Sequence, residues 1–432
     1  MWKMRGRRRN RMWDVRLVLV LAFVTALLVA AAVFYLGWGV LGVDKVKKEK
    51  AIDASTLFDL VKLAFGVVAG AGALVALIVA YRRQRIDEDG ALREHTRLHT
   101  ERFTTAVTQI GDDSPAVKLG GVHALAGLAD DAPTAELRQT CVDVLCAFLR
   151  LPYTAESNLP SDDEAARHDY LALREVRHTV IRLIRDHLRL PDDEPRSWRG
   201  LDLDFTGVVF DGGDFSGSVF RNSHVNFTDA TFLIGLVNLY TVVVESCVVD
   251  FTGARFCGAR VEFGGICLGD DVRMTFHEAV ITGGMVSFRD ARVGEAAELS
   301  FRGAAVSGGT LVFSSIVTAG LLNLSDVRID GGTLLFVGAL VKGGLRCTRA
   351  VFGSEDGPST VVSFENTLFD GCAADLGAYC APGAVDWHHC RYSGGFVSFE
   401  RASGEPPVGL LTHGEPLSEE LVIPAAWQAP PS

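Results

Sequence analysis

The side chains best suited to bind a metal gather near the C-terminal end of the chain. They are Cys372, Cys380, His388, His389 and Cys390. Structural zinc sites favour cysteine pairs separated by only a few residues, and this group contains no such pair. The pattern therefore favours an irregular late repeat filled by buried thiols over a zinc site.

The remaining chemistry-bearing residues form no recognisable catalytic motif. The sequence has no Gly-x-x-x-x-Gly-Lys-Ser/Thr phosphate loop, and its glycine pairs recur at regular intervals instead. Histidines without a paired nucleophile lie in segments expected to be helical: His95, His99, His123, His168, His178 and His187. We predict no catalytic, cofactor-binding or metal-binding residue and no cofactor. An active site built from repeated surface carboxylates is the alternative.

One phrase recurs through the C-terminal half of the chain. It consists of a Phe, a small residue and then a second apolar residue. Examples are Phe227-Thr-Asp-Ala230-Thr-Phe232, Phe251-Thr-Gly-Ala254-Arg-Phe256 and Phe276-His-Glu-Ala279-Val-Ile281. The first apolar residue returns about every 12 positions, and no single copy can bury its own apolar face. The repeat predicts a stacked solenoid, which offers a recognition surface rather than a catalytic cleft.

Short β-type runs and glycine pairs follow the second apolar residue in many copies. Runs such as Met285-Val-Ser-Phe288 suit ladder strands. Pairs such as Gly283-Gly284 and Gly308-Gly309 permit corners with positive φ and close backbone stacking. Two phrases, about 24 residues, would form one turn, so the domain would hold roughly eight turns along about 40 Å.

Residues 205–220 keep a strict five-residue step, reading Phe205-Thr-Gly-Val-Val-Phe210-Asp-Gly-Gly-Asp-Phe215-Ser-Gly-Ser-Val-Phe220. Together with pairs such as Ala230/Phe232, in which a small residue stands two positions before a large one, this segment resembles the pentapeptide-repeat family. The resemblance implies a right-handed quadrilateral β-helix. Steps of seven after Phe220 depart from strict fives, so we expect the extra residues to enter corners or to widen the coil.

Two apolar segments near the N-terminus are long enough to cross a membrane. The first span is predicted at 16–42, and the second, rich in glycine and alanine, at 57–81. A cleaved signal peptide is the alternative for the first, but the run is too long and no small-residue cleavage site follows it. The positive-inside rule places both termini in the cytoplasm, because basic residues precede the first span and follow the second.

Between the spans and the repeats, the pattern predicts a helical connector at 82–198. The second span is expected to continue as a helix beyond Tyr81. Two amphipathic stretches, 115–129 and Ala135–Arg150, predict an αα-hairpin. Its inward stripes are expected to be Val117, Val122, Leu125 and Leu128, followed by Leu137, Cys141, Val144, Leu145 and Phe148.

A third connector helix is expected at about 167–189. Val176, Val180 and Ile184 would face inward, and the opposite face would carry Arg174, Arg177, Arg182, Arg185 and Arg189. We expect this arginine face to be solvated, opposite the acidic solenoid or the inner membrane leaflet; a dock for a phosphate or a partner is the alternative. This helix and Trp198 are expected to cover one end of the solenoid.

Net charge and cysteine content limit the classes of function and of fold that the chain can have. The formal net charge is −11, and residues 201–400 hold 23 Asp and Glu against 12 Lys and Arg. Such an acidic surface disfavours direct nucleic-acid binding, which needs cations at phosphates. The nine cysteines are odd in number and scattered, which indicates reduced core thiols rather than a disulfide framework.

The resulting organisation is mainly β with an α-helical N-terminal part. It consists of a basic N-terminus at 1–15, a first span at 16–42, an external loop at 43–56, a second span at 57–81, a helical connector at 82–198, a pentapeptide-repeat-like β-solenoid at 199–400 and a Pro-rich tail at 401–432. The tail is expected to be disordered or loosely packed; a peptide ligand for a partner is the alternative.

These features predict a bacterial, multi-pass, membrane-anchored protein without enzymatic activity, with its bulk in the cytoplasm. Its partners would be the lipid bilayer and an unidentified protein that binds the acidic solenoid. One alternative is an enzyme or signalling protein with a site between connector and solenoid. A lesser alternative comes from the family, some of whose members mimic nucleic-acid duplexes and bind topoisomerases.

Overall fold

The computed structural model describes residues 54–432 except 157–158, 161–162, 355–358, 412–417 and 429–432, together with 24–25, 28, 31–32 and 35–36. The predicted N-terminus at 1–15, most of the first span at 16–42 and most of the loop at 43–56 therefore lie outside the described residues. The chain divides into two compact units, residues 1–97 and 98–432.

The first unit contains most of the long helix α2 (Ala54–Ile110). Its segment Val61–Glu88 is long and apolar enough to cross a membrane, and it is the one such helix among the described residues. Large apolar side chains on it are exposed, among them Leu63, Phe65 and Leu77. The predicted continuation of the helix beyond Tyr81 is confirmed. The second predicted span therefore has a matching helix, whereas the first, at 16–42, stays a prediction.

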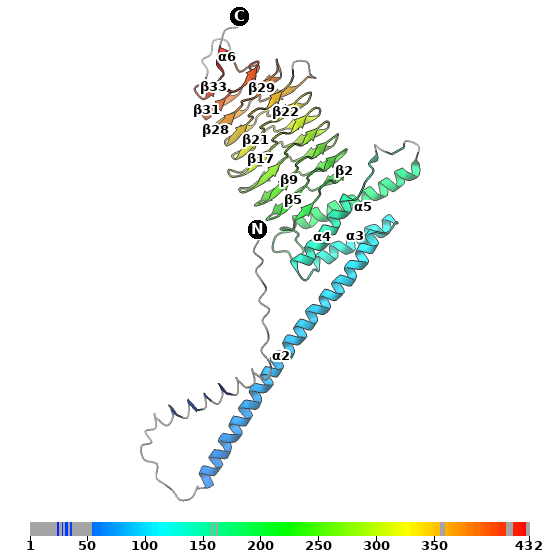
Figure 1. Ribbon diagram of the computed structural model, residues 1–432, viewed down its shortest axis with the longest axis vertical. Helices are drawn as coiled ribbons and strands as arrows, with labels where there is room; N and C mark the ends of the chain where they lie inside the picture. The colour runs from blue at the N-terminus through cyan, green and yellow to red at the C-terminus, as the bar shows by residue number, and fades with distance from the viewer. Residues whose placement is uncertain are drawn as a thin grey trace. The chain divides into compact units, whose positions relative to one another are not determined.

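Three helices open the folded part of the second unit (Figure 1): α3 (Pro115–Asp130), α4 (Ala135–Arg150) and α5 (Glu164–Arg189). The predicted hairpin and third helix are thus confirmed. Side-chain caps stabilise the N-termini of α4 and α5. Thr134 accepts a hydrogen bond from the Leu137 amide at 3.3 Å, and Asp163 accepts one from the Ala166 amide at 2.9 Å. Val117, expected inward, is instead 38% exposed, since the buried stripe of α3 begins only at Gly121.

A parallel β-solenoid of about nine turns, against the roughly eight expected, follows the helices, so the predicted stacked solenoid is confirmed. Each coil contributes one strand to each of four faces, which we number in chain order. Face 1 contains β1 (Leu203–Asp204), β5 (His224–Asn226), β9 (Val248–Asp250), β13 (Arg273–Thr275), β17 (Glu298–Ser300), β21 (Leu321–Asn323), β25 (Gly344–Arg346), the second halves of β28 (Leu368–Asp375) and β31 (Arg391–Ser398), and β33 (Leu421–Val422).

Faces 2 and 3 follow along each coil. Face 2 contains β2 (Val209–Phe210), β6 (Thr231–Phe232), β10 (Arg255–Phe256), β14 (Val280–Ile281), β18 (Ala305–Val306), β22 (Arg328–Ile329), β26 (Val351–Phe352), β29 (Tyr379–Cys380) and β32 (Ser403–Gly404). Face 3 contains β3 (Gly213–Asp214), β7 (Leu236–Asn238), β11 (Arg260–Glu262), β15 (Met285–Ser287), β19 (Thr310–Val312), β23 (Thr333–Leu335), β27 (Val361–Ser363) and β30 (Val385–Asp386).

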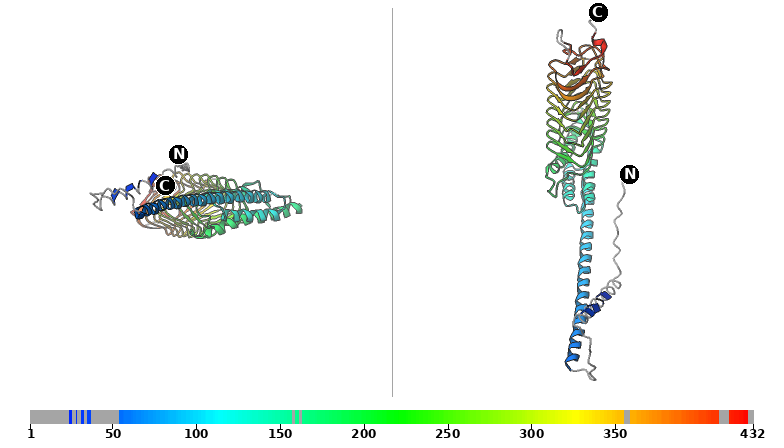
Figure 2. Two further views of the ribbon diagram at one scale, coloured as in Figure 1. Left: turned by 90° about the horizontal axis from the view of Figure 1, so that it is seen from below. Right: turned by 90° about the vertical axis from the view of Figure 1, so that its left-hand side faces the viewer.

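Face 4 closes the coil. It contains β4 (Val219–Arg221), β8 (Val243–Glu245), β12 (Cys267–Leu268), β16 (Arg292–Val293), β20 (Val317–Thr318), β24 (Leu340–Val341) and the first halves of β28 and β31. Figure 2 shows the strands of successive coils lying one above the other. Val225 pairs with Val249, and Val249 with Met274, so one coil takes about 24 residues as the repeat predicted.

The seven-residue steps of the sequence lengthen alternate faces. Between Phe256 and Phe263 the three-residue strand β11 turns Val261 inward, whereas the five-residue step from Phe251 to Phe256 holds the two-residue strand β10. Face 3, like face 1, is therefore longer than its neighbours, and the coil is oblong rather than square.

On faces 1 and 3, a tight turn follows the inward residue after most strands. The Ala254 amide, for example, donates to the Phe251 carbonyl at 3.0 Å, and Gly253 between them has a φ of 69°. A polar residue before the Phe often braces this turn, as when Asp250 accepts from the Thr252 amide at 2.8 Å. Many solenoid carboxylates and amides therefore hold corners rather than face solvent freely.

Columns of stacked aromatic rings fill the interior. Phe227, Phe251, Phe276 and Phe301 stack with ring centroids 4.4–4.5 Å apart, and each ring is almost completely buried. A second column on face 3 runs through Phe263, Phe288, Phe313, Phe336 and Phe364. Such offset ring pairs add to the large apolar area that each Phe buries.

Both ends of the solenoid are covered. At the first coil, Ile181 of α5 approaches so closely that a Cβ on Gly213 would lie 2.9 Å from it, and Trp198 is fully buried, as predicted. At the far end, Trp427 in the short helix α6 (Ala425–Gln428) packs 5.7 Å from Phe399 and donates to the Gly404 carbonyl at 3.0 Å. The expectation of a loose tail is therefore wrong for 418–428, since an uncovered last coil would expose its apolar interior.

Replacing one ring of the column is expected to destabilise the solenoid strongly. Phe276→Ala removes a fully buried ring and should lower the free energy of unfolding by about 3–5 kcal/mol, through lost burial and the cavity left behind. Urea unfolding of the full chain in detergent, followed by circular dichroism, measures this. Phe396→Ala is the matched control, because Phe396 is 51% exposed; an equal loss in both variants would contradict the stacking argument.

Candidate binding groove on the solenoid

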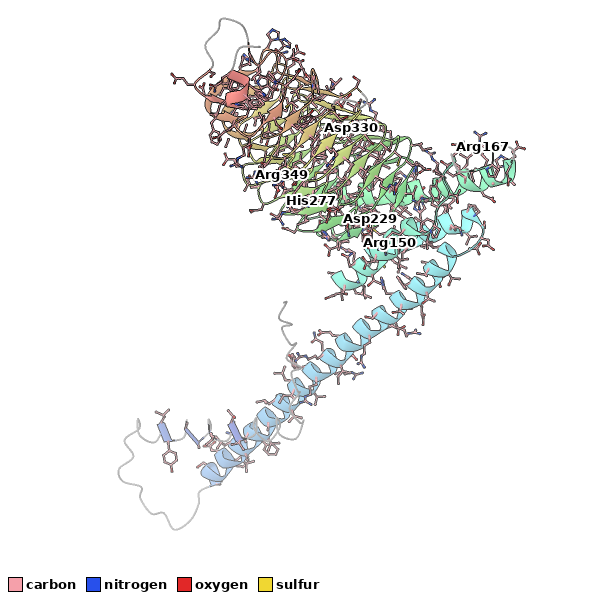
Figure 3. The ribbon with its side chains drawn as sticks, turned by 45° about the horizontal axis from the view of Figure 1, so that its top comes forward. Arg150, Arg167, Asp229, His277, Asp330 and Arg349 are labelled. Atoms are coloured by element: carbon pink, nitrogen blue, oxygen red, sulfur yellow. The ribbon has the colours of Figure 1, made fainter. Side chains whose placement is uncertain are left out.

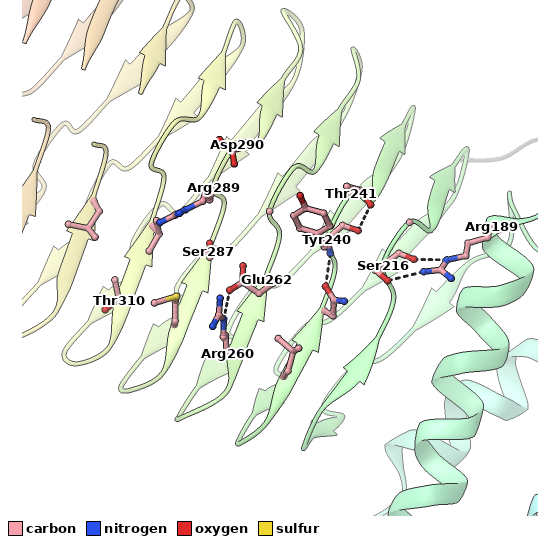
Figure 4. Close-up of a pocket in the computed structure, with 17 residues that line it drawn as sticks. Arg189, Ser216, Tyr240, Thr241, Arg260, Glu262, Ser287, Arg289, Asp290 and Thr310 are labelled. Atoms are coloured by element: carbon pink, nitrogen blue, oxygen red, sulfur yellow. Dashed lines mark hydrogen bonds and ion pairs between the residues drawn. The ribbon is translucent and has the colours of Figure 1, made fainter. Parts of the chain in front are cut away.

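A groove of about 930 Å³ runs along the outside of face 3, across five neighbouring strands from β7 to β23 (Figure 4). Its floor consists of the outward residues of these strands, and its edge follows the turns after them. The lining residues used below are Arg189, Tyr240, Arg260, Glu262, Met285, Arg289, Asp290, Val312 and Leu335. The groove exists because coil stacking aligns equivalent outward positions into continuous columns.

Tyr240 supplies an aromatic platform at the edge of this groove. Its ring lies over Gly264 of the next coil, where an added Cβ would come within 2.9 Å of the ring. The side chain is nevertheless 53% exposed. A flat, half-exposed ring whose position is set by the neighbouring backbone is a typical anchor for a binding partner.

The three arginines of the groove differ in their partners. Arg189, at the end of α5, donates to the Ser216 carbonyl at 2.7 Å and to its hydroxyl at 2.8 Å, and so closes one end. Arg260 forms an ion pair with Glu262. The exposed side chain of Arg289 has no hydrogen bond or ion pair with any residue that the structure describes, and neither does that of Asp290.

A separate polar cluster lies where the helices meet the first coil. The buried carboxylate of Asp211 accepts hydrogen bonds from the hydroxyls of Tyr153 at 2.6 Å and Tyr170 at 2.8 Å, and from Arg174 at 3.1 Å. His178 lies 3.2 Å from its second oxygen. Burial alone would raise the pKa of Asp211, but hydrogen bonds from His178, Tyr153 and Tyr170 outweigh it and hold the pKa well below its usual range.

This cluster has the chemistry of a structural joint. A carboxylate that stays ionised at any physiological pH is a poor general acid, and its oxygens are already occupied. Burial and the bond to Asp211 also raise the pKa of Tyr153 far above its ordinary value. Arg177 is buried nearby, donating to the carbonyls of Leu149 and Val209 at 2.7 Å each, with Tyr153 stacked 4.2 Å from its guanidinium.

The predicted arginine face of the third helix mostly faces the first coil. Arg174 and Arg185 pair with Asp211 and Asp214, and Arg189 bonds Ser216, whereas Arg182 is exposed. The predicted direction toward the acidic solenoid is thus confirmed, but Arg177, Arg174 and Arg185 are more buried than a solvated face would be. The reason is that α5 packs directly on the solenoid rather than across a layer of water.

A small polar recess of about 330 Å³ lies at the same junction, lined by residues that include Arg138, Asp192, Glu194, Arg199 and Arg221. Most of the charged side chains that line it already have partners. Arg199 contacts Asp192 at 2.9 Å, and Arg221 contacts Asp192 and, at 2.6 Å, Glu245. These pairs leave little uncompensated charge for a substrate.

The cysteines and histidines near the C-terminal end do not converge. Among the described residues, no group of three or more His, Cys, Asp or Glu side chains is placed to hold a metal. Burial raises the pKa of Cys372 to about 11 and those of Cys380 and Cys390 to about 12. His388 instead contacts Asp386 at 2.6 Å. All nine cysteines are free, as expected, and most are buried.

The helical histidines are likewise scattered. His99 is buried 3.9 Å from the Cys141 sulfur, and burial lowers its pKa. His187 stacks on Trp198 with ring centroids 4.0 Å apart and reaches Asp130 at 3.1 Å. His123 and His168 are exposed, and His95 lies in α2. His99 and Cys141 are a thiol–imidazole pair, but burial raises the pKa of Cys141 to about 11, so this thiol stays protonated at neutral pH.

Comparison with known proteins adds no assignment, because no protein-family model and no curated protein matches this chain. The groove is therefore the main functional candidate on structural grounds. Sequence analysis did not single out Tyr240 or Arg289. Both stand directly after a polar–apolar pair, Asn238-Leu239 or Ser287-Phe288, at the second position of a turn, which is the signal that could have identified them.

Asp211→Asn is expected to loosen the junction between α5 and the first coil. Removing the charge from this buried, fully bonded position should cost about 3–5 kcal/mol of unfolding free energy at neutral pH. Denaturant unfolding and hydrogen exchange of α5 in the full chain measure the effect. Asp229→Asn is the control, because Asp229 is an exposed turn residue with a φ of 57°, which Asn also adopts readily.

The same variant has a predicted pH signature. The folded pKa of Asp211 lies below its unfolded value of about 3.9, so its contribution is complete above roughly pH 4 and is lost as the pH falls through the folded pKa. The stability difference between wild type and Asp211→Asn should therefore shrink on acidification. A difference that stays constant down to about pH 2 would contradict the assigned role.

Proposed function

We propose that this protein is a membrane-anchored, non-enzymatic scaffold of the pentapeptide-repeat type, with a right-handed coil, that presents its solenoid to a protein partner. The observation that supports this proposal is the groove on face 3, a continuous surface with an exposed ring and an arginine, Arg289, that has no partner among the described residues. In this proposal the spans at 16–42 and 57–81 hold the chain in a bacterial plasma membrane, with both termini and the solenoid in the cytoplasm.

The hydrogen bonds and ion pairs between the helices and the first coil favour a scaffold over an enzyme with a site at this junction. The carboxylate of Asp211 is fully hydrogen-bonded, and Arg199 and Arg221 in the junction recess contact carboxylates. An enzyme site usually keeps a reactive group poised near the operating pH. A substrate would have to displace several existing bonds to reach these groups.

The charge pattern also weighs against a nucleic-acid mimic. Arginines pair with carboxylates on neighbouring coils, as Arg221 does with Glu245 at 2.6 Å and Arg349 does with Asp326 at 2.7 Å. Figure 3 labels Arg349 on the solenoid. A duplex mimic needs evenly spaced, uncompensated negative charge, because its target binds phosphates through cations. The interleaved pairs interrupt such spacing.

Cysteine labelling tests the proposed topology. Lys48→Cys, in the predicted external loop, should react with a membrane-impermeant maleimide in intact cells, whereas Arg328→Cys on face 2 should react only after lysis. The wild-type chain sets the background from its native thiols. Labelling of Arg328→Cys in intact cells would place the solenoid outside and contradict the cytoplasmic assignment.

Crosslinking in native membranes tests the scaffold itself. A specific protein crosslinked to the full chain should be lost when residues 200–400 are deleted, while the deleted chain stays in the membrane fraction. Since the deletion leaves both predicted spans intact, the loss would report binding rather than mislocalisation. Turnover of a substrate by the purified full chain would overturn the proposal.

A further inference from the structure

The groove on face 3 combines apolar and cationic features in one line. Met285, Val312 and Leu335 provide apolar atoms along the floor, and Tyr240 provides a ring at the edge. Arg289 lies between them along the chain, two coils beyond Tyr240, with its guanidinium unpaired among the described residues. A ligand that fits must cover apolar surface and supply an acceptor for Arg289 in the same stretch.

The charged residues that line the groove indicate which charge the ligand should carry. The groove is lined by three arginines, Arg189, Arg260 and Arg289, and by two carboxylates, Glu262 and Asp290, whereas the surrounding solenoid residues 201–400 hold 23 acidic against 12 basic side chains. The groove is thus a basic strip on an acidic domain. The long-range field of the acidic domain opposes an anion, so any preference for an acidic side chain at this strip must come from the local contact with Arg289.

The length of the groove favours an extended peptide as its ligand. Five strands spaced about 4.8 Å apart span roughly 19 Å, which is the length of about six residues of extended peptide. The backbone groups of face 3 are already paired between coils, so recognition must come from side chains. In an extended peptide every second side chain points to the same surface, which would place three side chains in the groove.

We propose that the groove on face 3 binds an extended segment of a partner protein in which an acidic side chain, placed between apolar ones, pairs with Arg289 while an apolar neighbour covers Tyr240. This inference rests on the proposed scaffold function and names the chemistry of its partner. Tyr and Arg are the residue types that most often dominate binding energy at interfaces. Arg189 closes the end of the groove next to α5, which sets where the segment can begin.

Three matched peptide pools test the proposal. Each contains fluorescein-labelled hexapeptides with Leu, Val, Met or Phe at the first and fifth positions, Ser at the even positions, and Glu, Gln or Lys at the third. Anisotropy titration with the full chain in detergent should give binding of the Glu pool about tenfold tighter than that of the Lys pool. Equal binding of the three pools, or no saturable binding of the Glu pool, would overturn the proposal.

Variants assign the binding to the groove. Arg289→Glu should weaken binding of the Glu pool about tenfold and reverse the preference between the Glu and Lys pools. Arg328→Glu is the matched control, since Arg328 is an exposed strand residue on face 2 with no partner among the described residues. An equal loss with Arg328→Glu would show nonspecific attraction and overturn the assignment.

A third variant alters the shape of the groove without altering its charge. Gly264→Ala places a methyl group 2.9 Å from the original position of the Tyr240 ring and should displace it, so binding of the Glu pool should weaken severalfold, as in Tyr240→Ala. Circular dichroism of each variant checks that the solenoid stays folded. Unchanged binding in both variants would remove Tyr240 from the site.

The outcomes separate this inference from the scaffold function. If Arg289→Glu leaves the membrane crosslink to a partner intact, the groove proposal fails and the scaffold survives with its surface elsewhere. If deletion of residues 200–400 leaves the crosslink intact, the scaffold proposal itself fails. Self-association of the full chain that Arg289→Glu abolishes would identify a second copy as the occupant and overturn the peptide proposal.

Discussion

In-register stacking of one coil on the next is the constraint on which the rest of this structure depends. Neighbouring strands of the solenoid pair in parallel with an offset of about 22 to 29 residues, so each inward side chain meets its own counterparts above and below. A Phe at one level therefore requires a residue of compatible size at the next. The aromatic columns through Phe276 and Phe288 are the direct result.

The same register organises the outer surface. Outward residues of face 3 align as strictly as the inward ones, so Arg260, Met285 and Thr310 follow one another in a single column. A surface of this kind is linear and repetitive, and it binds best what is itself extended. Within the groove, Gly264 leaves room for the ring of Tyr240 from the neighbouring coil.

Stacking also creates two ends that must be closed. At the first coil this is done by helices, and the apolar residues of α3, α4 and α5 share one continuous core with the solenoid. The buried Asp211 cluster fixes the orientation of α5 there, because several donors must converge on one carboxylate. At the last coil Trp427 serves the simpler purpose of covering apolar surface.

Sequence alone determined the class of fold, the three connector helices and the number of residues in one turn of the solenoid. Each of these depends on a local periodicity of apolar residues that is visible in the sequence. The columns of Phe and Ala, the hairpin at Pro115–Asp130 and Ala135–Arg150, and Trp198 at the entry of the solenoid were all predictable in this way. The seven-residue spacing after Phe220 indicated a departure from a strictly square coil, but it did not decide between residues inserted at corners and longer faces.

Only the tertiary structure decided which surface residues belong together. Asp211 and Tyr153 lie 58 positions apart in sequence, and Tyr240 and Arg289 belong to different coils, so no local pattern links them. The packing of residues 418–428 was likewise not predictable, because Trp427 is buried by a contact with Phe399 that sequence spacing does not encode. Periodicity specifies which side chains turn inward, whereas the partners of an outward or terminal side chain are fixed only when distant segments pack.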